Sequence, residues 1–322
     1  MKENQIFTTA LVAVAVLLLL LSLGRFMGSN KAEKYRISIV LDNSSSEGWG
    51  SFRKGLNAAM KRYNMEYNYV TTNRFHSIQE ENRILEQEVK GGADGIITEL
   101  RATEGTGEIL NSLAKEVKVE LVESAREAVA PELSIPSFSV DEEALGKALA
   151  EEVLHSPLKK EKLRIGILAG NQQKRNMQER LKALETTLRD GNQEIAWVIE
   201  DRGETEKDLK EENHKKGVDA IVALDNDNLL SAARYTEETG RSFIELYGVG
   251  DSEELIYDLD QGVIRSLIVI DHYDMAYTAV EYLWKSLSGG KNLPESHQVN
   301  FYIANANNMY TDKMEQILFP TG

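Results

Sequence analysis

A tryptophan between two glycines, Gly48-Trp49-Gly50, follows a short apolar run and a stretch of small polar residues that opens with Asp42 and Asn43. A buried strand has no need of such a segment, and neither does an ordinary turn. Carboxylate and amide groups exchange hydrogen bonds with polar groups, and an indole ring offers an apolar face. These residue types together are suited to binding a small molecule, so the elements that position them decide whether they meet.

The sequence lacks the motifs of the common catalytic and metal centres. Its five histidines form no HExxH pair, and there is no G-x-S-x-G, no phosphate-binding G-x-x-x-x-G-K-[ST] and no G-x-G-x-x-G that opens a helix. The run at 225–228, DNDN, suggests calcium, but the glycine and terminal glutamate of an EF-hand loop are missing. The sequence therefore favours a binding protein with no enzymatic activity, cofactor or metal.

The absence of cysteine excludes disulfides, thiolate metal sites, cysteine nucleophiles and the lipid anchor of a lipoprotein. The formal net charge of −15 over 322 residues disfavours nucleic acid as a partner, because the surface repels phosphate backbones. Acidic residues alternate with lysine and arginine along the chain, which is typical of solvated helix faces.

Short apolar runs alternate with amphipathic patterns from residue 35 onward, at the roughly 20–30-residue interval of a strand–helix–strand unit. Phe52, Leu56, Ala59 and Tyr63, for example, share one helical face. The runs predict strands at Ile37–Leu41, Glu66–Thr71, Gly95–Thr98, Val117–Val122, Arg164–Ala169, Glu194–Ile199, Ala220–Leu224, Phe243–Gly248 and Arg265–Ile270.

Two similar segments, GGADGIIT at 91–98 and KGVDAIVA at 216–223, suggest a chain of two like halves. We therefore predict an α/β fold with two doubly wound parallel sheets. Ligands of such sheets bind beyond the carboxyl ends of the strands, and the polar stretch from Asp42 to Gly50 occupies such a place.

The N-terminus carries an uncharged apolar run from Ile6 to Leu23, long enough at about 27 Å to cross a hydrocarbon core. We interpret residues 1–24 as an uncleaved transmembrane signal anchor and 25–34 as a polar linker. A cleaved secretory leader is an alternative, although the run exceeds the usual leader core and no A-x-A-like site follows it. A buried helix is a third possibility.

Several segments between residues 35 and 304 resemble the type 1 periplasmic sugar-binding proteins, the ribose- and xylose-binding family. They include ISIVLDNSSSEGWGSFRKGLNAAM with its aromatic-bearing loop, GGADGIITEL, FSVDEEALGKALAEEVL, RIGILAGNQQKRNMQERLKAL and VDAIVALDNDNLLSAARYTEETG. The final segment, GVIRSLIVIDHYDMAYTAVEYLWKSLSGGK, resembles the family's last crossover and helix. The resemblance is distributed along the chain and depends on no single motif.

This resemblance implies two α/β lobes joined by three chain crossings, with the ligand closed between them. We expect the crossings near Glu123, Ile270 and Val299. Lobe 1 would then comprise 35–123 and 271–298, lobe 2 would comprise 124–270 and 299–310, and 311–322 would form a tail.

The resemblance also implies a set of ligand-contacting side chains. Carboxylates accept hydrogen bonds from sugar hydroxyls, arginine and asparagine donate to the ligand, and an aromatic ring covers the C–H face. Trp49 and Arg180 match the family's aromatic and arginine positions. The full predicted set is Asp42, Asn43, Trp49, Glu99, Arg101, Glu123, Asp141, Arg180, Asp225, Asn226, Asp251 and Asp271.

Structural roles compete with ligand contact at several of these positions. Asp42 and Asn43 are equally suited to capping a helix, and Asp141 is a natural cap for the helix after it. Glu99 and Arg101 could pair with each other.

Further alternatives are a surface tryptophan at Trp49, a surface i,i+4 ion pair for Arg180 and a hinge hydrogen bond for Glu123. The sequence also departs from the family at Gly250, where an aspartate is expected and Asp251 stands one residue later. Near Ile270 the family has a glutamine, and here Asp271 follows. These changes alter the partners of the ligand hydroxyls, so ribose is not carried over as the ligand.

These observations predict an extracytoplasmic sugar receptor held to the cell membrane by its N-terminal helix. Closure of the lobes would be read by a membrane partner, either a sensor histidine kinase or an ABC transporter permease, and the anchor slightly favours the kinase. A ligand-independent interaction module is the main alternative, and an enzyme on the same fold is a weaker one. A lactose-repressor-type regulator is disfavoured, because such proteins begin with a basic helix-turn-helix.

Overall fold

The computed structural model of the chain describes residues 34–125, 129, 131–158, 160–290 and 296–320. The predicted anchor at 1–24 and nearly all of the predicted linker at 25–34 lie outside these ranges. Among the residues that are described, no helix has both the length and the apolar character needed to cross a membrane.

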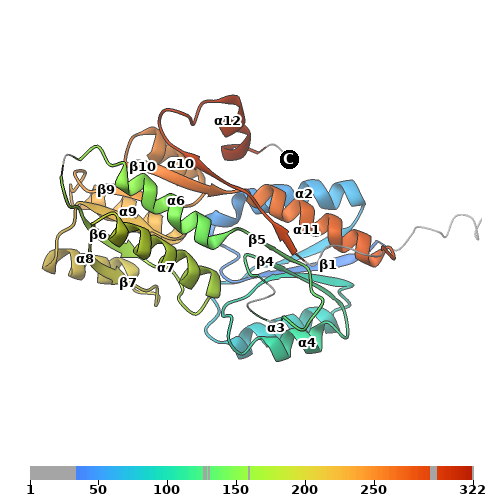
Figure 1. Cartoon of the computed structure of the whole chain (residues 1–322). Helices are drawn as coiled ribbons and strands as arrows, with labels where there is room; N and C mark the ends of the chain where they lie inside the picture. The colour runs from blue at the N-terminus through green and yellow to red at the C-terminus, as the bar shows by residue number, and fades with distance from the viewer. Residues whose placement is uncertain (1–33, 126–128, 130, 159, 291–295, 321–322) are drawn as a thin grey trace, which may run out of the picture. The chain divides into compact units, whose positions relative to one another are not determined.

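Two six-stranded sheets form the framework of the chain from Arg36 onward, and each carries helices on both faces (Figure 1). Every strand predicted from the apolar runs is present, which gives the expected α/β fold of two parallel-sheet lobes. In sheet order the first has β11 (Ser296–Gln298), β5 (Ser137–Ser139), β4 (Lys118–Val122), β3 (Gly95–Glu99), β1 (Arg36–Leu41) and β2 (Glu66–Val70). The second has β12 (Phe301–Ala304), β10 (Ile264–Ile270), β9 (Glu245–Val249), β8 (Ala220–Ala223), β6 (Arg164–Leu168) and β7 (Glu194–Ile199).

We call each sheet with its helices a lobe. All strand pairs are parallel except β10 with β12. Lobe 1 carries the short 3-10 helix η1 (Glu47–Trp49), α2 (Gly50–Tyr63), α3 (Ile78–Lys90), α4 (Gly107–Leu113) and α11 (His272–Leu287). Lobe 2 carries α6 (Glu142–Leu154), α7 (Arg175–Asp190), α8 (Thr205–Lys215), α9 (Asn226–Glu238), α10 (Glu253–Asp260) and α12 (Asp312–Leu318).

The chain passes between the lobes at three places. It first leaves lobe 1 after β5, because Ser137 and Phe138 pair with β4 and with β11 of the first sheet. This crossing lies near residues 140–141, whereas the sequence analysis placed it at Glu123. The other passages lie between β10 and α11 and between β11 and β12, and the corresponding expectations were Ile270 and Val299.

The repeated Gly-Ala/Val-Asp segments have the same structural role in both lobes. Asp94 accepts a hydrogen bond from the backbone N–H of Arg36 at 2.7 Å, and Asp219 accepts one from Arg164 at 3.0 Å. In each lobe, an aspartate just before the third strand thereby accepts a hydrogen bond from the backbone N–H of the residue that begins the first strand. The repeated sequence segments therefore correspond to the same hydrogen bond at the beginning of the first strand in each sheet.

Two glycines allow close helix packing beside the region where the lobes meet. A Cβ atom on Gly55 of α2 would lie 2.2 Å from the carbonyl oxygen of Tyr273 in α11. A Cβ atom on Gly146 of α6 would lie 2.4 Å from the carbonyl oxygen of Arg180 in α7. Because no side chain fits at either place, these glycines fix how closely α11 and α7 approach their neighbours.

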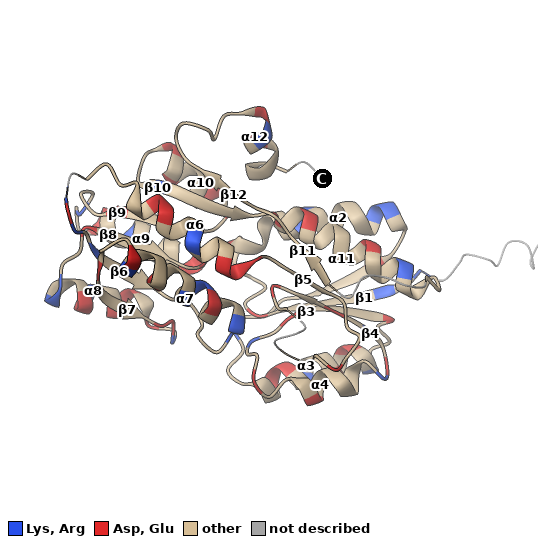
Figure 2. Cartoon of the chain, in the orientation of Figure 1, with Lys and Arg blue, Asp and Glu red and all other residues tan. Residues whose placement is uncertain are grey.

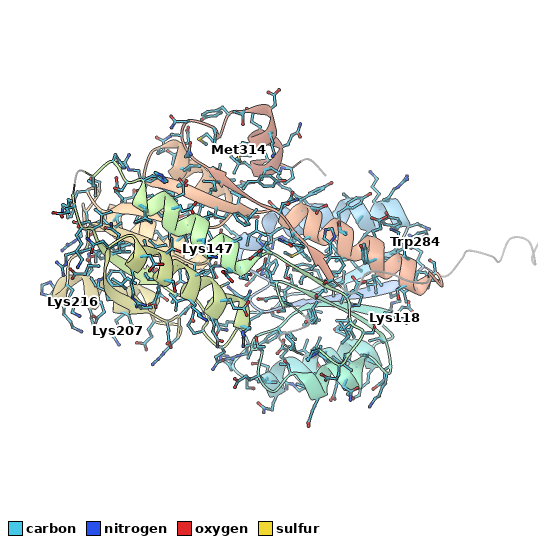
Figure 3. The ribbon with its side chains drawn as sticks, viewed as in Figure 1. Lys118, Lys147, Lys207, Lys216, Trp284 and Met314 are labelled. Carbon is cyan, nitrogen blue, oxygen red and sulfur yellow. The ribbon has the colours of Figure 1, made fainter. Side chains whose placement is uncertain are left out.

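The apolar core of lobe 2 includes the C-terminal helix. Met314 and Leu318 of α12 are buried in the same cluster as Leu229 of α9 and Leu255 of α10, and Figure 3 labels Met314 on this helix. The segment 311–322, expected as a tail, therefore contains a helix that contributes to the core.

Charged residues of both signs are interspersed along the helices (Figure 2). Several form pairs one turn apart, such as Lys147 with Glu143 on α6 and Arg175 with Glu179 on α7. Such exposed pairs contribute little to stability, because water and salt screen the charges and ordering two long side chains costs entropy.

One acidic side chain lies inside lobe 1 without an ionic partner. In β4, Val119 and Leu121 join the core cluster beneath α3 and α4, so the alternation of the strand turns Glu120 toward the opposite face, where α11 packs. Glu120 is 1% exposed, and neither of its carboxyl oxygens has a hydrogen-bond partner among the described residues. Burial raises its pKa well above the ordinary value, so the side chain is held in its protonated form.

We predict that Glu120→Leu stabilises the protein, because it replaces a buried unsatisfied carboxyl group by an apolar side chain. The expected gain is about 1–3 kcal/mol in the free energy of unfolding. The gain should increase with pH, since the unfolded chain releases the Glu120 proton near the ordinary pKa while the folded chain retains it.

Urea unfolding at pH 5 and pH 8 measures both effects, and Glu116→Leu at an exposed position of the same lobe is the control. A Glu120→Leu protein no more stable than the wild type at either pH would show that the carboxyl group is satisfied.

Candidate functional site

A cavity of about 140 Å³ lies between the two lobes. Its wall comes from the ends of, and the loops that follow, β1, β2, β3 and β4 of the first sheet and β6, β8, β9 and β10 of the second. These loops all stand at the carboxyl ends of parallel strands, which is where open α/β sheets bind ligands.

Most of the predicted contact residues line this cavity. They are Asp42, Asn43, Trp49, Glu99, Glu123, Arg180, Asp225, Asn226 and Asp251. The structure thus brings together side chains that are more than two hundred positions apart in the sequence, such as Asp42 and Asp251. Contact of each with a ligand stays a prediction.

Three predicted residues do not line the cavity. Arg101 donates from Nε to the carbonyl oxygen of Phe75 at 2.5 Å, and it also bonds Gln173 across the lobes. Asp141 caps α6 by accepting from the N–H of Ala144, and Asp271 caps α11 in the same way. Backbone and capping partners therefore occupy these side chains.

Trp49 forms part of the lobe 1 wall and is 9% exposed. Its ring packs edge-on against Phe52, with ring centroids 5.3 Å apart, and lies 5.7 Å from the ring of His272. The neighbouring Gly48 has a purpose that the sequence did not reveal, since a Cβ atom there would lie 3.0 Å from the Cβ of Asn226 in lobe 2. The glycine lets the two walls approach each other beside the indole.

Two residues of the wall have left-handed backbone conformations. Asn43 has a φ of 57° and Glu123 a φ of 56°. This region costs residues with a Cβ atom about 1–2 kcal/mol, and asparagine tolerates it better than glutamate does. Such strain persists where the surrounding structure imposes it, and here it directs both side chains to the place where the lobes meet.

His272, the first residue of α11, links Glu123, which follows β4, to Asp251 of lobe 2. Its Nε2 lies 3.0 Å from Glu123 Oε1, and its Nδ1 lies 3.1 Å from Asp251 Oδ2. Burial opposes a charge on the ring, but the two carboxylates outweigh it and raise the pKa of His272 to about 10. Burial also tends to raise the pKa of Glu123, yet the bond from His272 holds it below the ordinary value. The imidazolium is thus charged at neutral pH.

Lys174 extends from lobe 2 to two carboxylates of lobe 1. Its Nζ lies 3.3 Å from Asp42 Oδ2 and forms a direct ion pair with Glu99. Burial disfavours the charged amine, but the two acids outweigh burial and hold the pKa of Lys174 above its ordinary value. The pairing of Glu99 with Arg101 considered from the sequence is replaced by this contact.

Arg180 is buried in lobe 2 at 1% exposure. Its Nε donates to Glu142 Oε2 at 2.7 Å, and its Nη1 donates to the carbonyl oxygen of Leu224 at 2.6 Å. Burial raises the pKa of Glu142 above its ordinary value, although the charge of Arg180 offsets part of that rise. Arg180 therefore belongs to a buried network between α6 and α7 and is not the surface arginine of the alternative interpretation.

Three polar atoms in the lobe 2 wall lack a hydrogen-bond partner among the described residues. They are Nη2 of Arg180, Nδ2 of Asn226 and Oδ1 of Asp251. The Arg180 Nη2 also lies 2.7 Å from Glu142 Oε2, but without the geometry of a hydrogen bond. Buried polar groups in proteins are nearly always bonded, so two donors and one acceptor on residues that line one cavity indicate a place for a polar molecule.

Several residues of the cavity wall were not predicted from the sequence. Among them are Arg74, Asn171, Lys174, Asn176 and His272. Asn171, Lys174 and His272 all follow carboxyl ends of strands, so the rule that singled out Asp42 could have included them. Arg74 follows an edge strand in a polar loop that has no distinguishing signal.

No metal site is evident in the described ranges, since no group of three or more histidine, aspartate or glutamate side chains is arranged to hold an ion. In the DNDN run, Asp225 caps α9 and Asp227 accepts from Asn43 and Ser46 across the lobes. Burial raises the pKa of Asp225 above its ordinary value.

Residues 37–291 match the family model of the periplasmic binding protein domain. The chain belongs to this family. Among curated protein sequences none matches it.

Several solved structures share the fold of this chain. A carbohydrate transporter solute-binding protein from Agrobacterium radiobacter, solved with D-arabinose, has 17% identity and a TM-score of 0.79 over 89% of this chain and 100% of that one. GanP, a glucose-galactose binding protein from Geobacillus stearothermophilus, has 21% identity and a TM-score of 0.74 over 87% and 100%. XylFII in its complex with LytSN has 16% identity and a TM-score of 0.74 over 85% and 99%. At these identities the likeness shows the fold alone.

We predict that Glu142→Leu destabilises the protein strongly, because it leaves the buried guanidinium of Arg180 without its carboxylate. Loss of one partner of a buried pair costs about 3–5 kcal/mol. Glu179→Leu on α7 is the matched control, since it breaks the half-exposed pair with Arg175 and should cost less than about 1 kcal/mol. Equal losses for the two variants in urea unfolding would contradict the assigned role of the Arg180–Glu142 pair.

Proposed function

We propose that this periplasmic binding protein holds a small sugar or polyol in the cavity between its lobes. The observation that carries the proposal is that Arg180, Asn226 and Asp251 each have a buried polar atom without a hydrogen-bond partner in the residues that the structure describes, and line one cavity together with Trp49. A polyol presents hydroxyl groups that both accept and donate, so one molecule can satisfy the two donors and the acceptor.

The indole supports a ring-shaped ligand. Its face suits the C–H side of a sugar ring, because the negative π-face attracts the positive C–H edges. Once the lobes exclude water, a hydroxyl in the wrong place would leave a buried partner unsatisfied, which lets a polar site discriminate between similar sugars.

The similar structures agree with a sugar as the ligand class. Relatives by fold were solved with D-arabinose, α-D-tagatopyranose and D-allose. These proteins, like the family as a whole, are solute-binding proteins, so we propose binding without chemical conversion for this chain as well.

We further propose that the lobes lie outside the cytoplasm, held at the cell membrane by the apolar segment at residues 6–23. A membrane partner would read lobe closure, either a sensor histidine kinase for induction or an ABC permease for uptake. The complex of XylFII with LytSN supports a protein partner for this fold. The anchor slightly favours the sensory role.

We expect one sugar of a panel to raise the melting temperature of the protein progressively with concentration, because it binds the folded state only. The panel comprises D-arabinose, D-xylose, D-allose, D-glucose, D-galactose, D-tagatose and myo-inositol. Asn226→Asp removes the free Nδ2 donor and retains the oxygen that accepts from Ser252 N–H, and it should weaken binding at least fivefold, about 1 kcal/mol.

Trp49→Ala should weaken binding by a similar factor, since it removes the ring platform. Asn307→Asp and Trp284→Ala make the same changes away from the cavity and should bind like wild type. No response to any sugar, or equal binding by cavity variants and controls, would refute the assignment.

Fractionation of cells that express the full chain tests the anchor. We expect the protein in the membrane fraction after carbonate washing, and a variant without residues 1–24 in the soluble fraction of the cell. A shortened, soluble form of the full chain would show a cleaved leader in place of an anchor.

A further inference from the structure

The lobes make a buried ionic contact with each other that involves no ligand. Lys174 precedes α7 in lobe 2, and its ammonium group contacts Asp42 after β1 and Glu99 at the end of β3 in lobe 1. The side chains are 13%, 4% and 6% exposed respectively. Water therefore screens this contact far less than it screens a surface ion pair.

Lobe 1 holds the two acids in position by itself. Asp42 Oδ1 accepts from the backbone N–H of Phe75 at 2.8 Å, and Glu99 Oε2 accepts from the backbone N–H of Asp42 at 2.9 Å. Burial raises the pKa of Glu99 to about 8 against the charge of Lys174, and the neighbouring Asp42 adds to the rise. The two acids can therefore be ionised side by side only with a cation close to both. Lys174 is that cation, and it reaches them only while the lobes are together.

The position of Lys174 on its own helix gives an independent argument. It is the N-cap residue of α7, and its side chain makes no capping hydrogen bond. Lysine is a poor N-cap, and a positive charge at a helix N-terminus is unfavourable. Local helix stability therefore does not account for this lysine, whereas the acids across the cavity do.

A second buried ionic contact, His272 with Asp251 at 3.1 Å, lies where the chain crosses between β10 and α11. The remaining contacts between the lobes are more exposed or uncharged. Arg74 pairs with Asp201 at 2.6 Å, but the arginine side chain is 35% exposed. Asn43 and Ser46 donate to Asp227 at 2.8 and 2.7 Å. Solvent competes more effectively for such groups, so these contacts contribute less to the free energy of lobe closure and mainly determine how the two lobes align.

We infer that Lys174 is an internal latch, which keeps the lobes closed in the absence of ligand by neutralising Asp42 and Glu99 from the opposite lobe. The unliganded state of this protein is then mainly closed. If the proposed function holds, a sugar that uses these two carboxylates must displace the ammonium group, so Lys174 also sets the affinity of the site.

The distance between the lobes in ligand-free protein tests the inference. The natural chain contains no cysteine, so two introduced ones can be spin-labelled specifically. Gln87→Cys on α3 of lobe 1 and Glu206→Cys on α8 of lobe 2 are exposed positions for the labels. Pulsed electron paramagnetic resonance on the full-length chain in detergent, without sugar, gives the distance distribution.

The chain with Lys174 intact should give one narrow distance, with an open population of at most about a tenth. Lys174→Met, which keeps the length of the side chain and removes the charge, should shift most molecules to a longer and broader distribution, because both acids lose their cation. A second variant, Asp42→Asn with Glu99→Gln, removes the opposite charges and should open the lobes equally. If circular dichroism shows that Lys174→Met is unfolded, this double variant alone tests whether the ion pair keeps the lobes closed.

Lys147→Met on α6 is the matched control, since it breaks an exposed pair with Glu143 (Figure 3 labels Lys147) and should leave the distance unchanged. A wide distribution with Lys174 intact, an unchanged one in the latch variants, or opening in the control would each overturn the inference. The measurement contains no sugar, so it is independent of the sugar panel. A closed, latched protein that ignores every sugar would refute the proposed function alone.

Discussion

This structure depends on one constraint, the burial of charged side chains between the carboxyl ends of the strands of its two sheets. Every strand that feeds the cavity ends there, and the loop after each strand carries polar side chains. A charge removed from water is tolerated only with a partner. The need to pair buried charges therefore determines how the site is arranged, and each cation of the wall forms an ion pair with at least one carboxylate.

The cations of the cavity wall are all paired with carboxylates, so the few polar atoms without a hydrogen-bond partner among the described residues are informative. His272 serves Glu123 and Asp251, and the guanidinium of Arg180 serves Glu142. Against this background, the atoms of Arg180, Asn226 and Asp251 that lack a hydrogen-bond partner in the described part of the chain are the ones to which we assign the proposed ligand. The lobe 1 acids, in contrast, already have a cation, so the two walls of the cavity are not equally available to a sugar.

The sequence predicted the framework well because its signals are local. Strands such as Ile37–Leu41 are apolar runs of the right length. The rule that ligands bind beyond the carboxyl ends of parallel strands pointed to Asp42 and Asn43, which line the cavity. The sequence did not reveal β5, because Ser137-Phe138-Ser139 is too short and polar to form an apolar run. The first crossing was therefore placed too early.

Partnerships were harder to predict than positions. Lys174 and Glu99 are 75 residues apart, and no periodic pattern links them. Aspartate is ambiguous in a further way, because the same side chain can bind a ligand or cap a helix. Asp141 and Asp271 follow strands as Asp42 does, yet each accepts from the first turn of its own helix. Only the direction of the side chain separates these roles, and that direction is set by distant parts of the fold.

The packing of α12 has a practical consequence for handling the protein. Because Met314 and Leu318 belong to the core of lobe 2, a chain cut before this helix would expose apolar surface of that core and favour aggregation and proteolysis. Affinity tags and fluorescent fusions at the C-terminus therefore belong beyond Pro320, with a spacer that leaves the last helical turn free to dock.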